Sequence, residues 1–262
     1  MSLTAPSPET VLITGAARRI GRAIALDMAS RGWRVGVHYR RSREDAEGLV
    51  AEIRAGGGIA ATLAGHLEEI DDVHTLIPRC GKELGPPTCL INNASEFSLD
   101  TIATATPETW DTHLDINLKA PVFLAQSLFH NLPQNTHGNV INIIDQRVWR
   151  LTPDFFSYTI SKAGLWAATQ MLAQALAPKV RVNAIGPGPV LKSVHQSDDD
   201  FEREKHSTLL ERGPTLDEIA SAVRFILDTP SITGQMIALD GGQHLIRSGG
   251  AGSSSVPVQG TS

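Results

Sequence analysis

The chain has 262 residues, of which 41% are hydrophobic, enough to bury a sizeable core. Its 23 Lys and Arg residues against 28 Asp and Glu residues give a formal net charge of −5, which argues against a basic protein that coats nucleic acid. The sequence lacks an apolar run of the roughly 20 residues that span a bilayer, and it begins without the features of a signal peptide. We therefore expect a cytoplasmic protein that binds neither membranes nor nucleic acids, with Cys80 and Cys89 reduced and no metal bound.

Short apolar runs alternate along the chain with segments long enough for helices. Continuous runs of this kind are typical of strands buried on both faces of a parallel sheet. The expected strands are Val11–Thr14, Val35–Tyr39, Ile59–Leu63, Cys89–Ala94, Val140–Ile144, Val182–Gly186 and Met236–Leu239, and the expected helices include Arg22–Arg31, Glu44–Ala55, Pro107–His130 and Phe155–Ala177. The alternation predicts an α/β fold with one Rossmann-type domain over residues 10–246: a doubly wound parallel sheet of about seven strands, with about six helices on its two faces. Residues 1–9 and the Gly/Ser-rich residues 247–262 are expected to be flexible.

The first expected strand leads into a turn that contains two glycines, Thr14-Gly15-Ala16-Ala17-Arg18-Arg19-Ile20-Gly21. A glycine at the strand exit permits a tight turn, and one at the helix start lets the backbone approach a pyrophosphate. An ordinary strand-to-helix turn is the alternative, but the position on the first strand favours nucleotide binding. We expect the cofactor contacts in this turn to come from Gly15, Arg18, Arg19, Ile20 and Gly21.

The second expected strand ends in His38-Tyr39-Arg40-Arg41-Ser42. NAD enzymes commonly carry an acidic residue at this position, where it holds the ribose 2′-hydroxyl. Two arginines suit a 2′-phosphate instead, because a guanidinium can bind phosphate with two parallel hydrogen bonds. A solvated helix cap is the alternative interpretation. The stretch predicts NADPH as the cofactor.

Tyr158 and Lys162 are four positions apart and share one face of an expected helix. Free tyrosine titrates near pKa 10, and a neighbouring ammonium favours the phenolate. We therefore expect Lys162 to lower the pKa of Tyr158, so that the phenol can donate a proton at neutral pH. An accidental spacing on an amphipathic helix is the alternative.

These motifs resemble those of the short-chain dehydrogenase/reductase family. The glycine turn is similar to its TGxxxGxG signature with Arg19 in place of the middle Gly, Asn92-Asn93-Ala94-Ser95 is similar to its NNAG motif, and Tyr158 with Lys162 is similar to its YxxxK pair. The resemblance covers about residues 10–245 and implies that Asn117 holds a water relaying protons from Lys162. It also implies cofactor contacts from Leu67, Asn93, Ala94, Ser95, Tyr158, Lys162, Pro187 and Gly188, with His66 where the family has Asp.

Asp145 stands thirteen residues before Tyr158, where the family usually has a serine that binds the substrate carbonyl. A carboxylate there repels a developing alkoxide, but it can accept hydrogen bonds from a nitrogen heterocycle or donate a proton to it. A turn-capping role beside Arg147 is the alternative. Asp145 therefore favours a substrate with ring nitrogens over a plain ketone.

Arg19, the HYRRS stretch, the NASEF stretch and Asp145 together resemble pteridine reductases and the related dihydromonapterin/dihydrofolate reductases. The resemblance implies that Phe97 and the nicotinamide sandwich a flat pterin. It also implies that Ser95 and Arg19 contact substrate or phosphate, while Asp145 and Tyr158 handle protons. A place in the core is the alternative for Phe97.

The resulting hypothesis is an NADPH-dependent oxidoreductase that transfers hydride to a C=N bond of a pterin-like small molecule. A reductase of ketones or 3-oxoacyl substrates is one alternative, and an NADP-binding sensor without catalysis is another. Lys192–His206 is expected to be a mobile lid over the substrate by the resemblance, or else a solvated loop. Relatives commonly form homotetramers or homodimers, so we expect a homo-oligomer.

Overall fold

The computed structural model describes residues 9–192 and 196–246. Seven parallel strands form one sheet in the order β3-β2-β1-β4-β5-β6-β7. The strands are β1 (Thr10–Ile13), β2 (Arg34–Tyr39), β3 (Ile59–Ala64), β4 (Cys89–Asn92), β5 (Gly138–Ile143), β6 (Val180–Pro187) and β7 (Met236–Leu239). The expected Rossmann-type fold is confirmed, whereas the expected flexible ends, apart from Glu9, lie outside the described residues.

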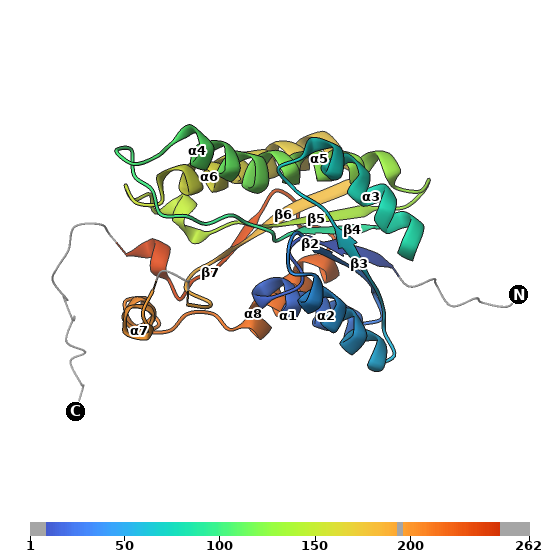
Figure 1. Ribbon diagram of the computed structural model, residues 1–262, viewed down its shortest axis with the longest axis horizontal. Coiled ribbons are helices and arrows are strands. Elements are labelled where there is room, and N and C mark those ends of the chain that lie inside the picture. Colours follow the sequence, from blue (N-terminus) through green and yellow to red (C-terminus); the bar gives the residue numbers. More distant parts are fainter. Residues whose placement is uncertain (1–8, 193–195, 247–262) are drawn as a thin grey trace, which may run out of the picture.

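Helices cover both faces of the sheet (Figure 1). One face carries α1 (Arg19–Ser30), α2 (Arg43–Ala55) and α8 (Leu216–Asp228), and the other carries α3 (Ile70–Leu84), α4 (Pro107–Leu114), α5 (Ala120–Asn131) and α6 (Phe156–Leu176). The strand order reverses between β1 and β4, so the loops that leave these two strands diverge to opposite sides. A crevice at such a switch point is the usual ligand position in open α/β sheets.

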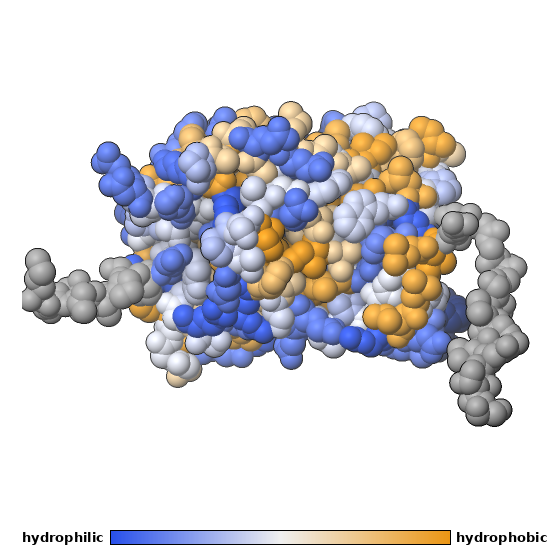
Figure 2. Space-filling model, turned by 180° about the vertical axis from the view of Figure 1, so that it is seen from behind, coloured by the Kyte–Doolittle hydropathy of each residue, from blue (hydrophilic) through white to orange (hydrophobic). Residues whose placement is uncertain are grey.

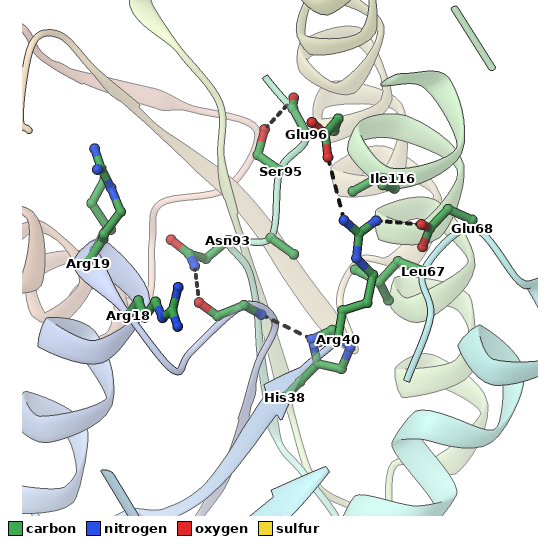
Figure 3. A pocket seen from close by; sticks show the side chains of 13 residues that line it. Arg18, Arg19, His38, Arg40, Leu67, Glu68, Asn93, Ser95, Glu96 and Ile116 are labelled. Atoms are coloured by element: carbon green, nitrogen blue, oxygen red, sulfur yellow. Dashed lines mark hydrogen bonds and ion pairs between the residues drawn. The ribbon is translucent and has the colours of Figure 1, made fainter. Parts of the chain in front are cut away.

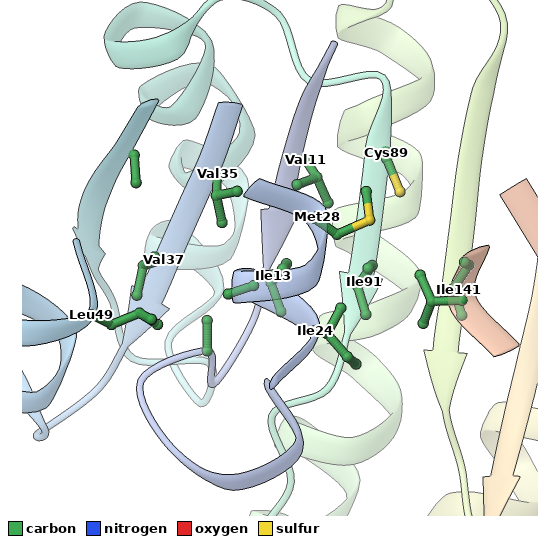
Figure 4. Packing of buried hydrophobic residues seen from close by; sticks show 14 of the residues in the cluster. Val11, Ile13, Ile24, Met28, Val35, Val37, Leu49, Cys89, Ile91 and Ile141 are labelled. Atoms are coloured by element: carbon green, nitrogen blue, oxygen red, sulfur yellow. The ribbon is translucent and has the colours of Figure 1, made fainter. Parts of the chain in front are cut away.

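The two larger of three hydrophobic clusters in the described residues lie on opposite faces of the sheet, and β1 contributes to both because its side chains alternate. Val11 and Ile13 pack toward the α1, α2 and α8 side (Figure 4). Leu12 packs toward the α3 and α5 side. All three side chains are fully buried. Burying a side chain of this size contributes about 1.5–3 kcal/mol, which explains why continuous apolar runs become central strands here.

One expected helix contains an irregular turn. Residues Pro107–His130 were predicted as one helix, but a π-helical turn, η1 (Asp115–Lys119), separates α4 from α5. Pro121 explains it, because proline has no N–H to donate to the carbonyl four residues earlier, which is that of Asn117. The turn therefore lies at one of the expected catalytic residues, and π-turns are often found at functional sites.

The acidic segment after β6 also differs from expectation. Asp198–His206 forms a helix, α7, and Ser197 and Asp200 make a reciprocal capping box at its start. The acidic run is the first turn of that helix, where negative charge interacts favourably with the helix dipole. The alternative of a loop is therefore wrong for residues 198–206, whereas the lid stays a prediction. Residues 193–195 lie outside the described part of the chain.

Candidate active site

A cavity of about 340 Å³ lies at the carboxyl ends of β1, β2 and β4, and we call it the switch-point cavity (Figure 3). The glycine turn, the end of β2 and the loop after β4 supply most of its wall. Its lining residues are Gly15, Arg18, Arg19, Ile20, His38, Arg40, Leu67, Glu68, Asn93, Ala94, Ser95, Glu96 and Ile116. Most of these residues were expected to bind the cofactor, so the sequence motifs and the cavity coincide.

The glycine turn leaves no room for side chains at two positions. A Cβ on Gly15 would lie 2.9 Å from the Cα of Ala94, and Gly15 also has a positive φ of 60°. A Cβ on Gly21 would lie 2.5 Å from the carbonyl oxygen of Gly15. Asn93 fastens the same turn, because its amide donates to the carbonyls of Thr14 and Gly15 at 3.0 Å. The two glycines therefore let the turn pack closely on itself and on the loop after β4, which holds it rigidly.

Arg19 occupies a backbone conformation that favours glycine. Its φ is 54°, which costs an L-residue about 1–2 kcal/mol. This explains why the family pattern has a Gly at the position. The guanidinium donates to the carbonyls of Leu191 and Lys192 at 3.0 Å each, so it links the glycine turn to the segment after β6.

His38 supports the turn from below. Its Nδ1 accepts a hydrogen bond from the N–H of Gly15 at 3.0 Å, and its Nε2 lies 3.2 Å from the carbonyl oxygen of Gly65. A carbonyl only accepts, so Nε2 carries the proton and the ring is neutral. Burial lowers the pKa of His38 to about 4, although the Gly65 hydrogen bond opposes the change. Neutral His38, at the end of β2, therefore links the glycine turn to the residue that follows β3 through two hydrogen bonds.

Arg40 extends into the switch-point cavity and contacts two carboxylates. One is Glu68 at 2.5 Å, and the other is Glu96 at 3.8 Å (Figure 3). The other oxygen of Glu68, Oε2, is buried and has no hydrogen-bond partner within residues 9–192 and 196–246. Arg18 likewise pairs with Asp45. Arg18 and Arg40 therefore line the cavity, as the sequence predicts, but acidic side chains already balance much of their charge.

Tyr158 and Asp145 meet beside the loop that leaves β4. The hydroxyl of Tyr158 donates to Asp145 Oδ2 at 2.9 Å, and Asp145 Oδ1 accepts from the N–H of Arg147 at 2.8 Å. The two interpretations of Asp145 are therefore compatible, since the carboxylate caps a turn, η2 (Gln146–Trp149), and also faces the tyrosine. Burial raises the pKa of Asp145, so protonation of this carboxyl is easier than usual.

The expected lowering of the Tyr158 pKa is wrong. Burial raises the pKa of Tyr158 well above its ordinary value, and the negative charge of Asp145 raises it further. Lys162 does not offset this, because its Nζ donates to the carbonyl of Ile143 at 3.0 Å and lies 5.8 Å from the centre of the Tyr158 ring. Burial also lowers the pKa of Lys162 to about 8. The tyrosine is therefore held in its protonated form, as a proton donor requires.

The side-chain amide of Asn117 is saturated by four hydrogen bonds. Its oxygen accepts from the N–H of Glu96 at 2.9 Å and from the hydroxyl of Ser95 at 3.1 Å. Its nitrogen donates to the carbonyl of Glu96 and the hydroxyl of Ser161, both at 3.0 Å. The side chain therefore fastens the loop after β4 to α6, and the water relay stays a prediction.

Phe97 is half-buried in an aromatic group rather than in either core cluster. Its ring stacks on that of Phe155 with centroids 4.5 Å apart and meets Tyr158 edge-on at 4.7 Å. The guanidinium of Arg147 lies over the Phe155 ring, 4.9 Å from its centre. The structure thus brings Phe97, Tyr158 and Asp145 together, as the sequence predicts for a substrate site.

Some expected cofactor residues do not line the switch-point cavity. Tyr39 is buried in the core, and Arg41 is exposed. Ser42 precedes α2 without capping it through its side chain, and the exposed His66 gives its N–H to Asp72. Gly21, Tyr158, Lys162, Pro187 and Gly188 are also outside the lining. Glu68, Glu96 and Ile116 were missed, and their only signal was proximity to Leu67, Ser95 and Asn117.

The fold and this arrangement define a class of protein. The cavity lies where α/β proteins of this strand order bind dinucleotides. A buried tyrosine that can give up a proton lies beside the loop forming one wall of that cavity, so the class is that of the dinucleotide-dependent oxidoreductases.

Comparison with known proteins identifies the family. The sequence matches the family described as short chain dehydrogenase over residues 9–203. It is 30% identical over 242 residues to the 3-oxoacyl-(acyl-carrier-protein) reductase FabG of Staphylococcus epidermidis, with 90% of this chain and 99% of that protein aligned. It is also 30% identical over 253 residues to a putative ketoacyl reductase 2 of the granaticin polyketide synthase from Streptomyces violaceoruber, covering 94% and 100%. This chain belongs to the short chain dehydrogenase family.

Two solved structures are more similar in sequence. They are the FolM alternative dihydrofolate reductase 1 of Brucella canis and that of Brucella suis, each in complex with NADP. Both are 48% identical to this chain with a TM-score of 0.90, and they cover 92% and 93% of it and 96% and 98% of their own chains. The expected resemblance to the pteridine and dihydrofolate reductase subgroup is confirmed, as is the expectation of an NADPH-dependent oxidoreductase.

Proposed function

We propose that this protein uses NADPH to reduce a C=N bond in a pterin-like ring. The observation that carries the proposal is the pairing of Tyr158 with Asp145 next to Phe97. A carboxylate at this place repels the alkoxide that ketone reduction produces, whereas it binds ring N–H and amino groups. Similarity to two dihydrofolate reductases supports the same substrate class.

The residues of the switch-point cavity fit a dinucleotide phosphate. Gly15 lines this cavity in a turn that the two glycines allow to pack tightly, and Arg18, Arg19 and Arg40 supply cations around it. We infer that Arg40 binds the 2′-phosphate after release from Glu68, and that the glycine turn binds the pyrophosphate. When bound, NADPH supplies the hydride.

The protein's own residues control the proton and the orientation of the ring. Tyr158 is kept protonated by burial and by Asp145, so it donates the proton that the reduced nitrogen needs. Asp145 accepts hydrogen bonds from the ring or protonates it, and Phe97 presents an aromatic face for stacking. Lys162 supplies positive charge behind the tyrosine. A water that replenishes its proton would have to bind the backbone of Asn117, since the side-chain amide is saturated.

A spectrophotometric assay of NADPH oxidation tests the proposal. Dihydrobiopterin, dihydromonapterin and dihydrofolate are compared with a 3-oxoacyl thioester and a simple ketone, and we expect turnover only in the first group. Turnover of a ketone or thioester with none of the pterins would overturn the proposed substrate class. The 30% identical ketoacyl reductases make this the second candidate function.

Tyr158→Phe tests whether the protein is catalytic at all. Loss of the proton donor is expected to lower kcat by about 10²–10⁴-fold, while the affinity for NADPH stays unchanged. If Tyr158→Phe left cellular function intact while an Arg40→Gln change abolished it, a sensor would be the better description.

We also propose that the protein is a cytoplasmic homotetramer or homodimer. No helix in residues 9–192 and 196–246 is long and apolar enough to cross a membrane. Hydrophobic side chains gather near the end of the described chain (Figure 2), where Leu209, Leu210 and Leu245 are at least 60% exposed. Such exposed apolar area is typical of an interface. Light scattering coupled to gel filtration tests the assembly.

A further inference from the structure

Three buried polar side chains form a group that the proposed mechanism does not use. Asp100 comes from the loop after β4, His113 from α4 and Ser157 from the first turn of α6. Their exposed fractions are 2%, 1% and 0%. Buried polar groups of this kind usually need an explanation, because each costs free energy unless it is fully hydrogen-bonded.

The three side chains form one continuous chain of hydrogen bonds. The N–H of Ser98 points at His113 Nε2 at 3.2 Å, and His113 Nδ1 lies 2.6 Å from the hydroxyl of Ser157. That hydroxyl lies 2.5 Å from Asp100 Oδ2, while the N–H of Ser157 donates to Asp100 Oδ1 at 3.1 Å. We call Asp100, His113 and Ser157 the loop clamp.

Only one arrangement of protons satisfies the loop clamp. The backbone N–H of Ser98 can only donate, so Nε2 of His113 is an acceptor and Nδ1 carries the proton. The hydroxyl of Ser157 accepts a hydrogen bond from Nδ1 and donates one to the carboxylate of Asp100. Burial lowers the pKa of His113, which keeps the ring neutral, as this arrangement requires.

The same geometry excludes a hydrolytic triad. In a serine hydrolase the histidine accepts the serine proton and the carboxylate bonds to the histidine. Here the Ser157 hydroxyl donates its hydrogen bond to Asp100, and His113 donates a hydrogen bond to that hydroxyl. All three side chains are also buried, so a substrate carbonyl has no access to the hydroxyl.

Asp100 acts as the cap of the helix that carries Tyr158. Phe155 occupies the N-cap position of α6 and has no side chain that can accept a hydrogen bond. Asp100, from a distant loop, caps the helix instead. The backbone carbonyl of Asp100 accepts from the N–H of Phe156 at 3.2 Å, and the Asp100 carboxylate accepts from the N–H of Ser157. Negative charge at this end of the helix is also favoured by the helix dipole.

Phe155 shows that this junction is under strain. It adopts a left-handed conformation with φ 55° and ψ 49°, which is rare for a bulky residue and persists only where the surroundings impose it. The loop clamp supplies that constraint on one side of Phe155, and the stack with Phe97 supplies it on the other.

We propose that Asp100, His113 and Ser157 are positioning residues that fix Tyr158 and Phe97 relative to each other. Ser157 is the neighbour of Tyr158 in α6, and Ser98 is the neighbour of Phe97 in the loop. The loop clamp therefore joins the proton donor and the stacking ring through one set of buried hydrogen bonds. This inference rests on the proposed role of Tyr158 in proton transfer.

The test compares two hydroxyl deletions on the same buried helix. Ser157→Ala breaks the loop clamp, whereas Thr169→Val removes a hydroxyl that also links a donor to an acceptor, Asn142 Nδ2 at 2.9 Å and the Leu165 carbonyl at 2.7 Å. We expect kcat of the Ser157→Ala protein to fall about 10- to 100-fold, since misplacement by about 1 Å has effects of this size. Thr169→Val should lose thermal stability without this loss of kcat.

Asp100→Asn is the second variant, for the case in which Ser157→Ala does not fold. It keeps one oxygen that can accept from the Ser157 N–H and cap α6, but the amide nitrogen in place of Oδ2 cannot accept a hydrogen bond from the Ser157 hydroxyl. We expect it to fold, to bind NADPH normally and to lose kcat as Ser157→Ala does.

The pH dependence of kcat distinguishes positioning from stability. Asp145, Arg147, Lys162 and His113 are the titratable or charged groups that face Tyr158. A loosened Tyr158 moves away from Asp145 and toward water, so its pKa falls and the alkaline limb of kcat moves to lower pH. The limb should stay in place in Thr169→Val.

Each outcome has a definite meaning. Wild-type kcat and an unmoved limb in both loop-clamp variants would overturn the inference, as would an equal loss of kcat in Thr169→Val. An active Tyr158→Phe protein would instead overturn the proposed function. The two failures are therefore separable in one set of proteins.

Discussion

His38 makes the stability of this protein depend on pH through one buried imidazole. Its pKa falls from an ordinary value of 6.5 to about 4 because the folded protein buries the ring. Between these pH values the unfolded chain binds a proton that the folded protein does not. Stability is therefore complete above the unfolded pKa and is lost as the pH falls toward the folded one.

The size of the effect follows from the shift. Complete titration across this window removes about 3 kcal/mol of unfolding free energy, and about 2 kcal/mol is already lost between pH values of about 7 and 5. Protonation also gives Nδ1 a hydrogen that faces the N–H of Gly15, so the hydrogen bond from Gly15 to His38 is lost. In the folded protein this protonation occurs only near the folded pKa, so the affinity for NADPH should weaken as the pH approaches about 4.

Urea unfolding of wild-type and His38→Asn proteins at these two pH values, at one fixed protein concentration, measures the difference. The asparagine oxygen still accepts from Gly15 but does not titrate, so the variant should lose about 2 kcal/mol less than the wild type. His137→Asn, which removes an exposed imidazole, is the matched control and should behave as the wild type. Equal pH dependence in wild type and His38→Asn would refute the reasoning.

Three further changes probe the cavity and the reacting end. Arg40→Gln should raise the KM for NADPH about 10- to 100-fold, because a charged hydrogen bond to the 2′-phosphate is lost, and should leave the KM for NADH unchanged. The control is Arg43→Gln, which removes an exposed guanidinium paired with Glu47. Asp145→Ser should lower kcat/KM for a pterin about 10- to 100-fold and permit turnover of a ketone in the same assay, since the repelling carboxylate is gone. Arg19→Gly should change the unfolding free energy by no more than about 1 kcal/mol, because released strain and glycine entropy oppose each other, while the KM for NADPH rises.

The sheet could be predicted because its signal is local and repeated. Each strand is an apolar run, and each run is separated from the next by a segment long enough to cross over the sheet. The switch-point cavity could be predicted from the same pattern, since Gly15, His38 and Asn93 all lie within two residues of the end of a strand. The position of Arg40 in the cavity could be predicted for this reason, but its pairing with Glu68 could not.

The burial of Tyr158 and Lys162 could not be predicted from the sequence. The spacing of Tyr158 and Lys162 places them on one helix face, but it does not say how much water reaches them. Desolvation is the largest influence on both groups, and it raises the pKa of the tyrosine and lowers that of the lysine. The loop clamp was equally hidden, because 57 positions separate Asp100 from Ser157 and no motif marks either residue.

The loop after β4 shows how a segment without helix or strand can carry precise chemistry. Residues 93–100 are fastened at intervals by side chains from other elements: Asn117 binds Glu96, His113 binds Ser98, and Ser157 binds Asp100. Phe97 lies between two of these attachments, so its ring has little freedom to move before a substrate arrives. A stacking group that is fixed in advance costs less entropy on binding than one that must be ordered. Selection of a flat substrate therefore depends on buried hydrogen bonds as much as on the aromatic ring itself.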